Sequence, residues 1–134
     1  MTTSTRIKIR GYHEDRFGHV NNARYLELLE EARWAHLEAQ GLSIATLEAN
    51  GVFPVVVRLT ITYRRPASAG DELEIETKLL RSQRRRAVIG QQACFVGSEE
   101  VCVEAEITAV FLDVNTGRPV PLTHPAFRSW PELR

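Results

Sequence analysis

The chain has 134 residues and a mass of 15.2 kDa, which is the usual size of one domain. Hydrophobic residues make up 43% and charged residues 25%, which excludes a disordered chain, and Lys+Arg 17 balance Asp+Glu 17, without the basic excess of a general nucleic-acid binder. No apolar run is long enough for a membrane span, and residues 1–10 lack the apolar segment of a signal peptide. We therefore expect a single cytoplasmic domain over residues 1–134, with no nucleic-acid or membrane partner.

The first third of the chain is predicted to hold one strand and one long helix. Residues 5–12 alternate between polar and apolar side chains, which is typical of a strand. After an irregular polar stretch over residues 13–20, apolar side chains recur at i, i+3, i+4 and i+7, as on the buried face of a helix. The expected buried positions of this helix are Tyr25, Leu26, Leu29, Ala32, His36 and Leu37.

Both ends of the long helix carry recognisable signals. Asn21 or Asn22 is the expected N-terminal cap, because an Asn side chain accepts a hydrogen bond from the first free backbone N–H groups. Gly41 is the natural C-terminal stop. A second, short helix is predicted over residues 43–49.

From residue 55 onward the pattern is typical of strands separated by turns. The predicted strands cover residues 55–63, 73–79, 87–96 and 101–111. The predicted turns cover residues 64–71, 82–86, 97–100 and 115–119, and a short helix is expected over 124–130. This order predicts an α+β fold in which one main helix covers an antiparallel sheet, and it leaves the strand order open.

One segment carries a specific motif. The run Asp15-Arg16-Phe17-Gly18-His19-Val20-Asn21-Asn22-Ala23-Arg24-Tyr25, followed by Glu30-Glu31-Ala32-Arg33, resembles the signature of hotdog-fold acyl-CoA thioesterases of the 4-hydroxybenzoyl-CoA thioesterase-like family. Residues 63–66, followed by Gly70-Asp71, are similar to that family's connection between its second and third strands. The resemblance implies a five-stranded antiparallel sheet wrapped around the long helix. It also implies a homodimer or homotetramer with active sites at the subunit interface, which hydrolyses an acyl-CoA substrate without a metal or cofactor.

Asp15 is the first candidate for catalysis. It lies just before a helix N-terminus, whose positive dipole end favours an ionised carboxylate nearby. Such a carboxylate can attack a thioester carbonyl or deprotonate a water molecule that attacks it. The alternative is an Asp that only caps a turn. The resemblance places the family's catalytic Asp at this position.

The start of the helix is the second candidate. The backbone N–H groups of Asn22, Ala23 and Arg24 are expected to lack partners within the helix, so they can stabilise the oxyanion formed from a thioester. Asn21 is interpreted mainly as a cap, and Asn22 as a cap that also reaches the substrate. His19 either hydrogen-bonds the substrate carbonyl, orients Asp15, or only holds the loop shape.

A dense basic cluster, formed by Arg84, Arg85 and Arg86, is the candidate site for the coenzyme A phosphates. One arginine guanidinium group can donate two parallel hydrogen bonds to two oxygens of a phosphate. The alternative interpretation of this cluster is a solvated turn that binds nothing. Weaker candidates for the same role are Arg58, Arg64 and Arg65.

Three alternative interpretations stay open from the sequence. A glutamate on the helix is the catalytic carboxylate in a second hotdog subclass, and the chain offers Glu27, Glu30, Glu31 and Glu38. A hotdog hydratase or dehydratase would pair Asp15 with His19. A binding module would hold acyl-CoA without turnover. No metal is expected, because neither the histidines nor Cys94 and Cys102 have metal-ligand spacing.

Overall fold

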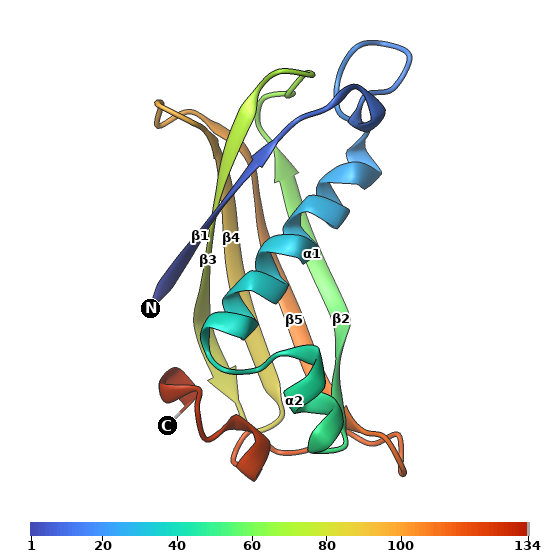
Figure 1. Cartoon of the computed structure of the whole chain (residues 1–134), viewed down its shortest axis with the longest axis vertical. Helices are drawn as coiled ribbons and strands as arrows, with labels where there is room; N and C mark the ends of the chain where they lie inside the picture. The colour runs from blue at the N-terminus through green and yellow to red at the C-terminus, as the bar shows by residue number, and fades with distance from the viewer. Residues whose placement is uncertain (134) are drawn as a thin grey trace.

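The computed structural model describes residues 1–133, which form one antiparallel sheet with a long helix across one face (Figure 1). The strand order in the sheet is β1-β3-β4-β5-β2, and every neighbouring pair is antiparallel. The predicted fold class is therefore confirmed. The elements are β1 (Thr2–Lys8), α1 (Asn22–Ala39), α2 (Ile44–Ala49), β2 (Val52–Tyr63), β3 (Glu72–Gln83), β4 (Arg86–Phe95) and β5 (Val101–Asp113), with 3-10 turns at Gly11–His13, Pro125–Phe127 and Pro131–Leu133.

Some strands and turns begin or end at residues other than the predicted ones. β1 lies earlier than predicted, because it pairs with β3 only as far as Lys8↔Glu72 before the chain leaves the sheet edge. The β3–β4 turn is shorter than predicted, since both strands extend to the pair Gln83↔Arg86. Arg84 in this turn has a φ of 49°, the only positive φ of a non-glycine residue among residues 1–133. The expected C-terminal helix is a single 3-10 turn at Pro125–Phe127.

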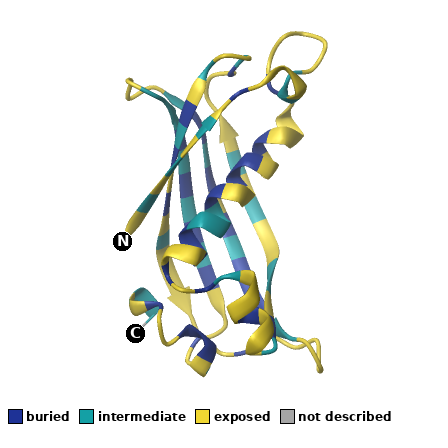
Figure 2. Cartoon of the chain, viewed as in Figure 1, coloured by how far each residue is buried: buried dark blue, intermediate teal, exposed yellow. Residues whose placement is uncertain are grey.

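α1 is amphipathic, and buried and exposed positions alternate around it (Figure 2). Leu26, which the periodicity placed on the buried face, is 38% exposed, whereas Leu28 is buried. The buried positions that follow Tyr25 recur at intervals of three or four residues and form one stripe along the helix. Leu26 comes one residue after Tyr25, so the helix turns it by about 100° away from that stripe. No helix in the described part of the chain is long and apolar enough to cross a membrane.

The hydrophobic core consists of two clusters. One lies beneath the first half of α1 and includes Tyr25, Leu29 and Ile107. The other lies at the opposite end of the sheet, where Trp130 is fully buried and Phe111 packs against Phe127 with ring centroids 4.6 Å apart. The C-terminal segment therefore closes the second end of the core, and burial of one such large apolar side chain contributes about 1.5–3 kcal/mol.

His36 joins α1 to the edge strand β1. Its side chain is fully buried, its Nδ1 lies 2.7 Å from Thr3 Oγ1, and its ring meets Trp130 edge-on. Burial lowers the pKa of His36, although the Glu132 carboxylate acts in the opposite direction. The folded chain therefore holds His36 preferentially in its neutral form.

This burial predicts that acid destabilises the fold through His36. In the unfolded chain His36 binds a proton near its ordinary pKa of about 6.5, whereas in the folded chain its pKa is lower. The free energy of unfolding therefore falls as the pH drops below about 6.5. We expect the thermal midpoint to fall more steeply between about pH 7.5 and about pH 5.5 in the unmodified protein than in His36→Gln. Equal slopes in circular-dichroism melts of the two proteins would contradict this role.

Candidate active site

A closed loop presents Asp15 and His19 just before α1. Glu14 and Val20 pair as an isolated antiparallel bridge, and the Asp15 N–H donates to the His19 carbonyl at 2.9 Å. Gly18 has a φ of +78°, which a residue with a side chain rarely adopts, and its N–H donates to the Asp15 carbonyl at 3.2 Å. The backbone therefore fixes the relative positions of the two candidate side chains.

The Asp15 carboxylate is held in place through only one of its two oxygens. Its Oδ1 accepts a hydrogen bond from the Phe17 N–H at 2.8 Å, and the side chain is exposed. No hydrogen bond to Oδ2 is found among residues 1–133. The carboxylate is thus oriented by the loop and keeps a second oxygen available to a reacting group.

The connection between β2 and β3 anchors this loop. Val20 N–H donates to the Ala67 carbonyl at 2.8 Å, and Ser68 Oγ donates to the Gly18 carbonyl at 2.9 Å. The Ala69 N–H donates to Glu14 Oε2 at 2.7 Å. Two segments that lie about fifty residues apart in the sequence therefore form one structural unit.

Asn21, one of the two predicted caps, caps α1, whereas Asn22 is the first residue of the helix and not its cap. The cap changes the expectation for the neighbouring amides. Asn21 Oδ1 accepts from the Ala23 N–H, and the Asn21 carbonyl accepts from the Arg24 N–H, both at 2.9 Å. Among residues 1–133 the Asn22 N–H makes no hydrogen bond. Of the three amides expected to lack partners within the helix, those of Ala23 and Arg24 donate to the capping Asn21, so Asn22 alone keeps a free donor at the start of the helix.

Two tyrosines hold the first turn of α1 in place. The buried Tyr25 hydroxyl accepts from the Ala67 N–H at 3.0 Å, and the Tyr63 hydroxyl donates to the Asn22 carbonyl at 3.1 Å, with the two rings 5.6 Å apart. Burial raises the pKa of Tyr25, so its hydroxyl stays protonated. Tyr63, expected only as part of a strand connection, thus belongs to the site as well, and its place in the motif with Pro66 is the sequence signal for it.

These elements enclose an open pocket of about 280 Å³ at the start of α1 and the end of β2. The lining residues are Asp15, Phe17, His19, Val20, Asn22, Tyr25, Tyr63, Arg64, Arg65 and Pro66. The structure thus brings together the three residues predicted to carry catalysis, Asp15, His19 and Asn22. One pocket thus contains a carboxylate, an imidazole and the residue whose backbone N–H is free, which are groups that acyl transfer can use.

The candidate phosphate-binding arginines lie at two different places in the fold. Arg84–Arg86 lie at the β3–β4 turn, at the opposite end of the sheet from the Asp15 loop (Figure 1). They do not line the Asp15 pocket of their own chain, because the 12 residues of β3 span about 40 Å. Arg64 and Arg65 line it instead.

Both pocket arginines are held by carboxylates. Arg64 Nη2 lies 2.6 Å from Glu104 Oε1, and the Arg64 guanidinium lowers the pKa of Glu104. Arg65 forms an ion pair with Glu100 and lies over the Phe95 ring, 4.5 Å from its centroid. Two arginines, each oriented by an ion pair, therefore line the pocket that contains Asp15.

The helix glutamates lie outside the pocket. All four are exposed, and Glu27 forms an ion pair with Arg24 at 2.8 Å. None of Glu27, Glu30, Glu31 and Glu38 lines the space that contains Asp15. The geometry thus favours Asp15 over a helix glutamate as the reacting carboxylate.

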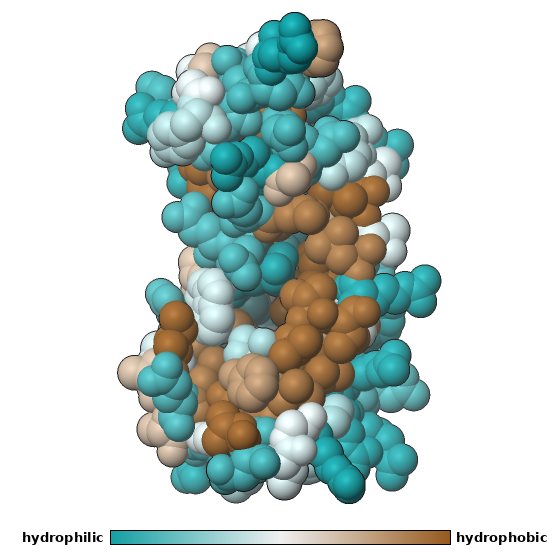
Figure 3. Space-filling model, turned by 90° about the vertical axis from the view of Figure 1, so that its right-hand side faces the viewer, coloured by the Kyte–Doolittle hydropathy of each residue, from teal (hydrophilic) through white to brown (hydrophobic). Residues whose placement is uncertain are grey.

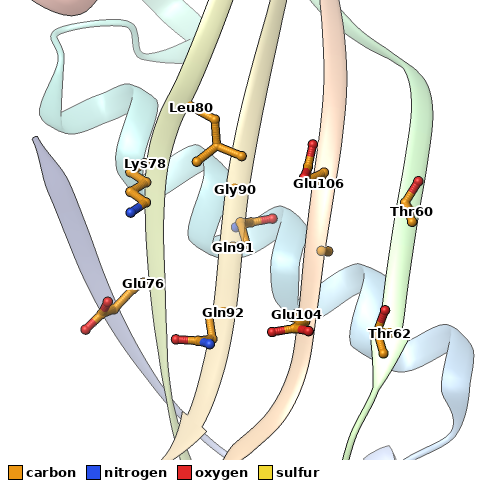
Figure 4. A pocket seen from close by; sticks show the side chains of 11 residues that line it. Thr60, Thr62, Glu76, Lys78, Leu80, Gly90, Gln91, Gln92, Glu104 and Glu106 are labelled. Atoms are coloured by element: carbon orange, nitrogen blue, oxygen red, sulfur yellow. The ribbon is translucent and has the colours of Figure 1, made fainter.

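A second hollow, of about 380 Å³, lies on the sheet face turned away from α1 (Figure 4). Figure 4 places Glu76, Lys78, Gln92 and Glu104 across three neighbouring strands. This polar surface contains no helix start, and Glu104 is already paired with Arg64. Nowhere in residues 1–133 do three His, Cys, Asp or Glu side chains form a group that could hold a metal ion.

Comparisons with known proteins identify the family of the chain. A model of the thioesterase-like superfamily matches residues 11–130. The long-chain acyl-CoA thioesterase FadM of Escherichia coli is 42% identical over 118 residues, which cover 88% of this chain and 89% of FadM. The acyl-CoA thioester hydrolase YbgC of E. coli O157:H7 is 33% identical over 120 residues, which cover 88% of this chain and 89% of YbgC. The crystal structure of the probable thioesterase YbaW from E. coli has a TM-score of 0.85 and 38% identity, covering 97% and 96% of the two chains.

A five-stranded antiparallel sheet wrapped around a single long helix defines the hotdog fold. With the match over residues 11–130, the chain belongs to the thioesterase-like superfamily, and it is a thioester hydrolase. The alternatives of a hydratase, a dehydratase and a non-catalytic binding module gain no support from these relatives.

Proposed function

We propose that this protein hydrolyses acyl-CoA thioesters to a free acid and coenzyme A, with Asp15 as nucleophile or general base. The observation that carries the proposal is the Asp15 carboxylate, oriented through Oδ1 and lining one pocket with His19 and Asn22. The names of FadM and YbgC support acyl-CoA as the substrate class, and that of FadM supports a long acyl chain.

In this mechanism the thioester carbonyl oxygen accepts a hydrogen bond from the Asn22 N–H, which stabilises the negative charge of the tetrahedral intermediate. As nucleophile, Asp15 Oδ2 bonds to the carbonyl carbon, the carbon–sulfur bond breaks, and coenzyme A leaves as a thiolate. Water then hydrolyses the resulting anhydride. As general base, Asp15 instead takes a proton from the water that attacks the carbonyl carbon.

His19 is proposed as the second polar group at the reacting carbonyl. Its side chain is exposed, and its backbone is fixed by the hydrogen bond from the Asp15 N–H. The imidazole therefore lies on the same closed loop as the carboxylate and lines the same pocket. From there it can orient the carbonyl or protonate the departing thiolate.

Asp15→Asn tests the carboxylate. The substitution keeps the size of the side chain and its capacity to accept a hydrogen bond from Phe17, but it removes the charge. We expect kcat to fall by on the order of 10²–10⁴, the range for loss of an acid–base group, with little change in KM. Thiol release from acyl-CoA measures the rate, and circular dichroism checks that the variant remains folded.

The controls for this experiment are Glu27→Gln, Glu30→Gln and Glu31→Gln, because these exposed glutamates lie outside the Asp15 pocket. Each control is expected to retain most of the activity. If one of them abolishes turnover while Asp15→Asn remains active, the catalytic carboxylate belongs to α1 and the proposed role of Asp15 is wrong.

Arg64 and Arg65 are proposed to bind the coenzyme phosphates, in preference to Arg84–Arg86. Of the arginines among residues 1–133, only Arg64 and Arg65 line the Asp15 pocket. Guanidinium groups suit phosphate oxygens, and the aromatic contact of Arg65 with Phe95 holds its planar group in place.

Arg65→Ala is therefore expected to raise KM for acyl-CoA several-fold and leave kcat nearly unchanged, since a phosphate contact is made equally in the ground and transition states. An acyl-pantetheine thioester, which lacks the nucleotide phosphates, should respond much less. Arg85→Ala is the matched control at the far turn. A larger KM effect at Arg85 would return the phosphate site to the Arg84–Arg86 cluster, contributed by another subunit.

We also propose that the protein forms a homodimer through β2, alone or as half of a homotetramer. β2 ends the sheet, so one row of its backbone N–H and C=O groups has no neighbouring strand in the chain. Phe53, Val56 and Val57 on this strand are 41%, 44% and 50% exposed, and Figure 3 shows apolar side chains gathered in a band on this side of the molecule. The other edge strand, β1, is short and mostly polar.

Light scattering tests the assembly. We expect a particle of two or four times the 15.2 kDa chain mass at working concentration. Val57→Lys places a charge on the exposed apolar part of β2 and should shift the particle toward the mass of one chain. A monomer in the unmodified protein would contradict the proposal.

A further inference from the structure

Tyr63 is the last residue of β2, and its side chain reaches the start of α1. Because side chains alternate along a strand, Tyr63 lies on the same face as Leu59 and Ile61, which pack against the core cluster beneath the first half of α1. The chain beyond Tyr63 is also fixed, because the Arg64 N–H donates to the Cys102 carbonyl of β5 at 2.8 Å. The backbone that carries the Tyr63 ring is therefore held firmly in the sheet.

The Tyr63 hydroxyl holds one peptide unit in the first turn of α1. It donates to the Asn22 carbonyl at 3.1 Å, while the N–H of the same peptide unit, that of Ala23, donates to Asn21 Oδ1 at 2.9 Å. The peptide unit that follows Asn22 is therefore held at both its carbonyl and its N–H. Because a peptide unit is planar, these two bonds fix its orientation as a whole.

The preceding peptide unit carries the Asn22 N–H, which has no hydrogen-bond partner among residues 1–133. Its carbonyl, that of Asn21, accepts from the Arg24 N–H at 2.9 Å. The two peptide units share the Asn22 α-carbon, so the direction of the free N–H depends on the bonds made by both. The helix and its cap supply the other bonds on these units, whereas Tyr63 reaches them from the sheet.

We propose that Tyr63 is a positioning residue for catalysis, which directs the Asn22 N–H toward the carbonyl oxygen of the bound thioester. Tyr63 and Asn22 line the same pocket as Asp15. The inference rests on the proposed thioesterase function, in which this N–H stabilises the charge of the tetrahedral intermediate. Such stabilisation depends on donors that are already fixed where the charge develops. Without the bond from Tyr63, the first helical turn would hold that N–H over a wider range of directions.

The location of this hydrogen bond separates positioning from stability. Tyr63 is 43% exposed and Asn22 is exposed, so water can satisfy the Asn22 carbonyl when the hydroxyl is removed. The Tyr25 hydroxyl, by contrast, accepts from the N–H of the fully buried Ala67. Loss of the Tyr25 hydroxyl leaves that N–H without a partner, which destabilises the fold. Loss of the Tyr63 hydroxyl is therefore expected to change catalysis with little effect on stability.

Tyr63→Phe tests the positioning role, because it removes the hydroxyl and keeps the ring beside that of Tyr25. We expect kcat for dodecanoyl-CoA to fall about tenfold, which is less than the loss of on the order of 10²–10³ when an oxyanion donor is removed outright. KM should change little, because the misplaced N–H matters most when the charge develops. Thiol release measures both constants, and the thermal midpoint should remain close to that of the unmodified protein.

Tyr12→Phe is the matched control, because Tyr12 is 73% exposed and lies outside the Asp15 pocket. It is expected to keep the kcat and KM of the unmodified protein, whereas Tyr25→Phe should lower the thermal midpoint. An unchanged kcat in Tyr63→Phe would overturn the inference. A loss confined to KM would make Tyr63 a substrate contact, and a thermal midpoint as low as that of Tyr25→Phe would make it a structural residue; either result also overturns the positioning role.

A spectroscopic experiment measures the hydrogen bond to the carbonyl without turnover. The probe is the ketone analogue of dodecanoyl-CoA, in which a methylene group separates the sulfur from the carbonyl carbon, so that no bond can be hydrolysed. A hydrogen bond weakens the carbon–oxygen double bond and lowers its infrared stretching frequency. We expect a lower frequency for the ketone bound to the unmodified protein and to Tyr12→Phe than for the ketone bound to Tyr63→Phe. Equal frequencies in all three proteins would overturn the inference.

The proposed function and the role of Tyr63 fail in different ways. If Asp15→Asn releases thiol from dodecanoyl-CoA at the unmodified rate, the proposed role of Asp15 fails, and the carbonyl frequency still tests Tyr63 because it requires binding alone. If Asp15→Asn loses turnover while Tyr63→Phe keeps both the kcat and the carbonyl frequency of the unmodified protein, the positioning role is wrong and the thioesterase function stands.

Discussion

Ala67 occupies the junction on which the rest of the site depends. Its N–H donates to the Tyr25 hydroxyl, and its carbonyl accepts from the Val20 N–H, so one buried residue ties together the catalytic loop, the first turn of α1 and the β2–β3 connection. A buried backbone group that loses its partner costs free energy, so these bonds are strongly favoured. The position of the free Asn22 amide relative to Asp15 follows from this junction.

The molecule separates the groups that stabilise the fold from those available for chemistry. Asp15 and His19 are exposed and are oriented mainly by backbone hydrogen bonds, whereas the buried side chains of α1 and the sheet provide the hydrophobic stabilisation. This separation places a solvent-exposed carboxylate beside a rigid scaffold. It also explains why Tyr25, although it touches the site, belongs to the core: burial keeps its hydroxyl protonated and engaged with Ala67.

Local sequence signals predicted the local structure well. The Asn21 cap, the long helix and the α+β fold follow from side-chain chemistry and periodicity within a few residues. Two expectations needed more than these signals. The Ala23 and Arg24 amides are occupied because Asn21 turns back on them, which is a local effect of the cap itself. The distance of Arg84–Arg86 from Asp15 follows from the length of β3, which no short window contains. The contact between Val20 and Ala67 depends on the pairing of distant strands, which local patterns do not determine.

The loop from Glu14 to Val20 is docked largely through main-chain atoms, and this has an evolutionary consequence. Phe17 is 79% exposed, and its backbone N–H, not its ring, orients Asp15. Mutations at Arg16 and Phe17 can therefore accumulate while the loop keeps its shape, provided that Gly18 retains its backbone conformation. Descendants of one ancestral gene can in this way acquire different rims around the same reacting centre, so divergence in substrate range does not require a new fold.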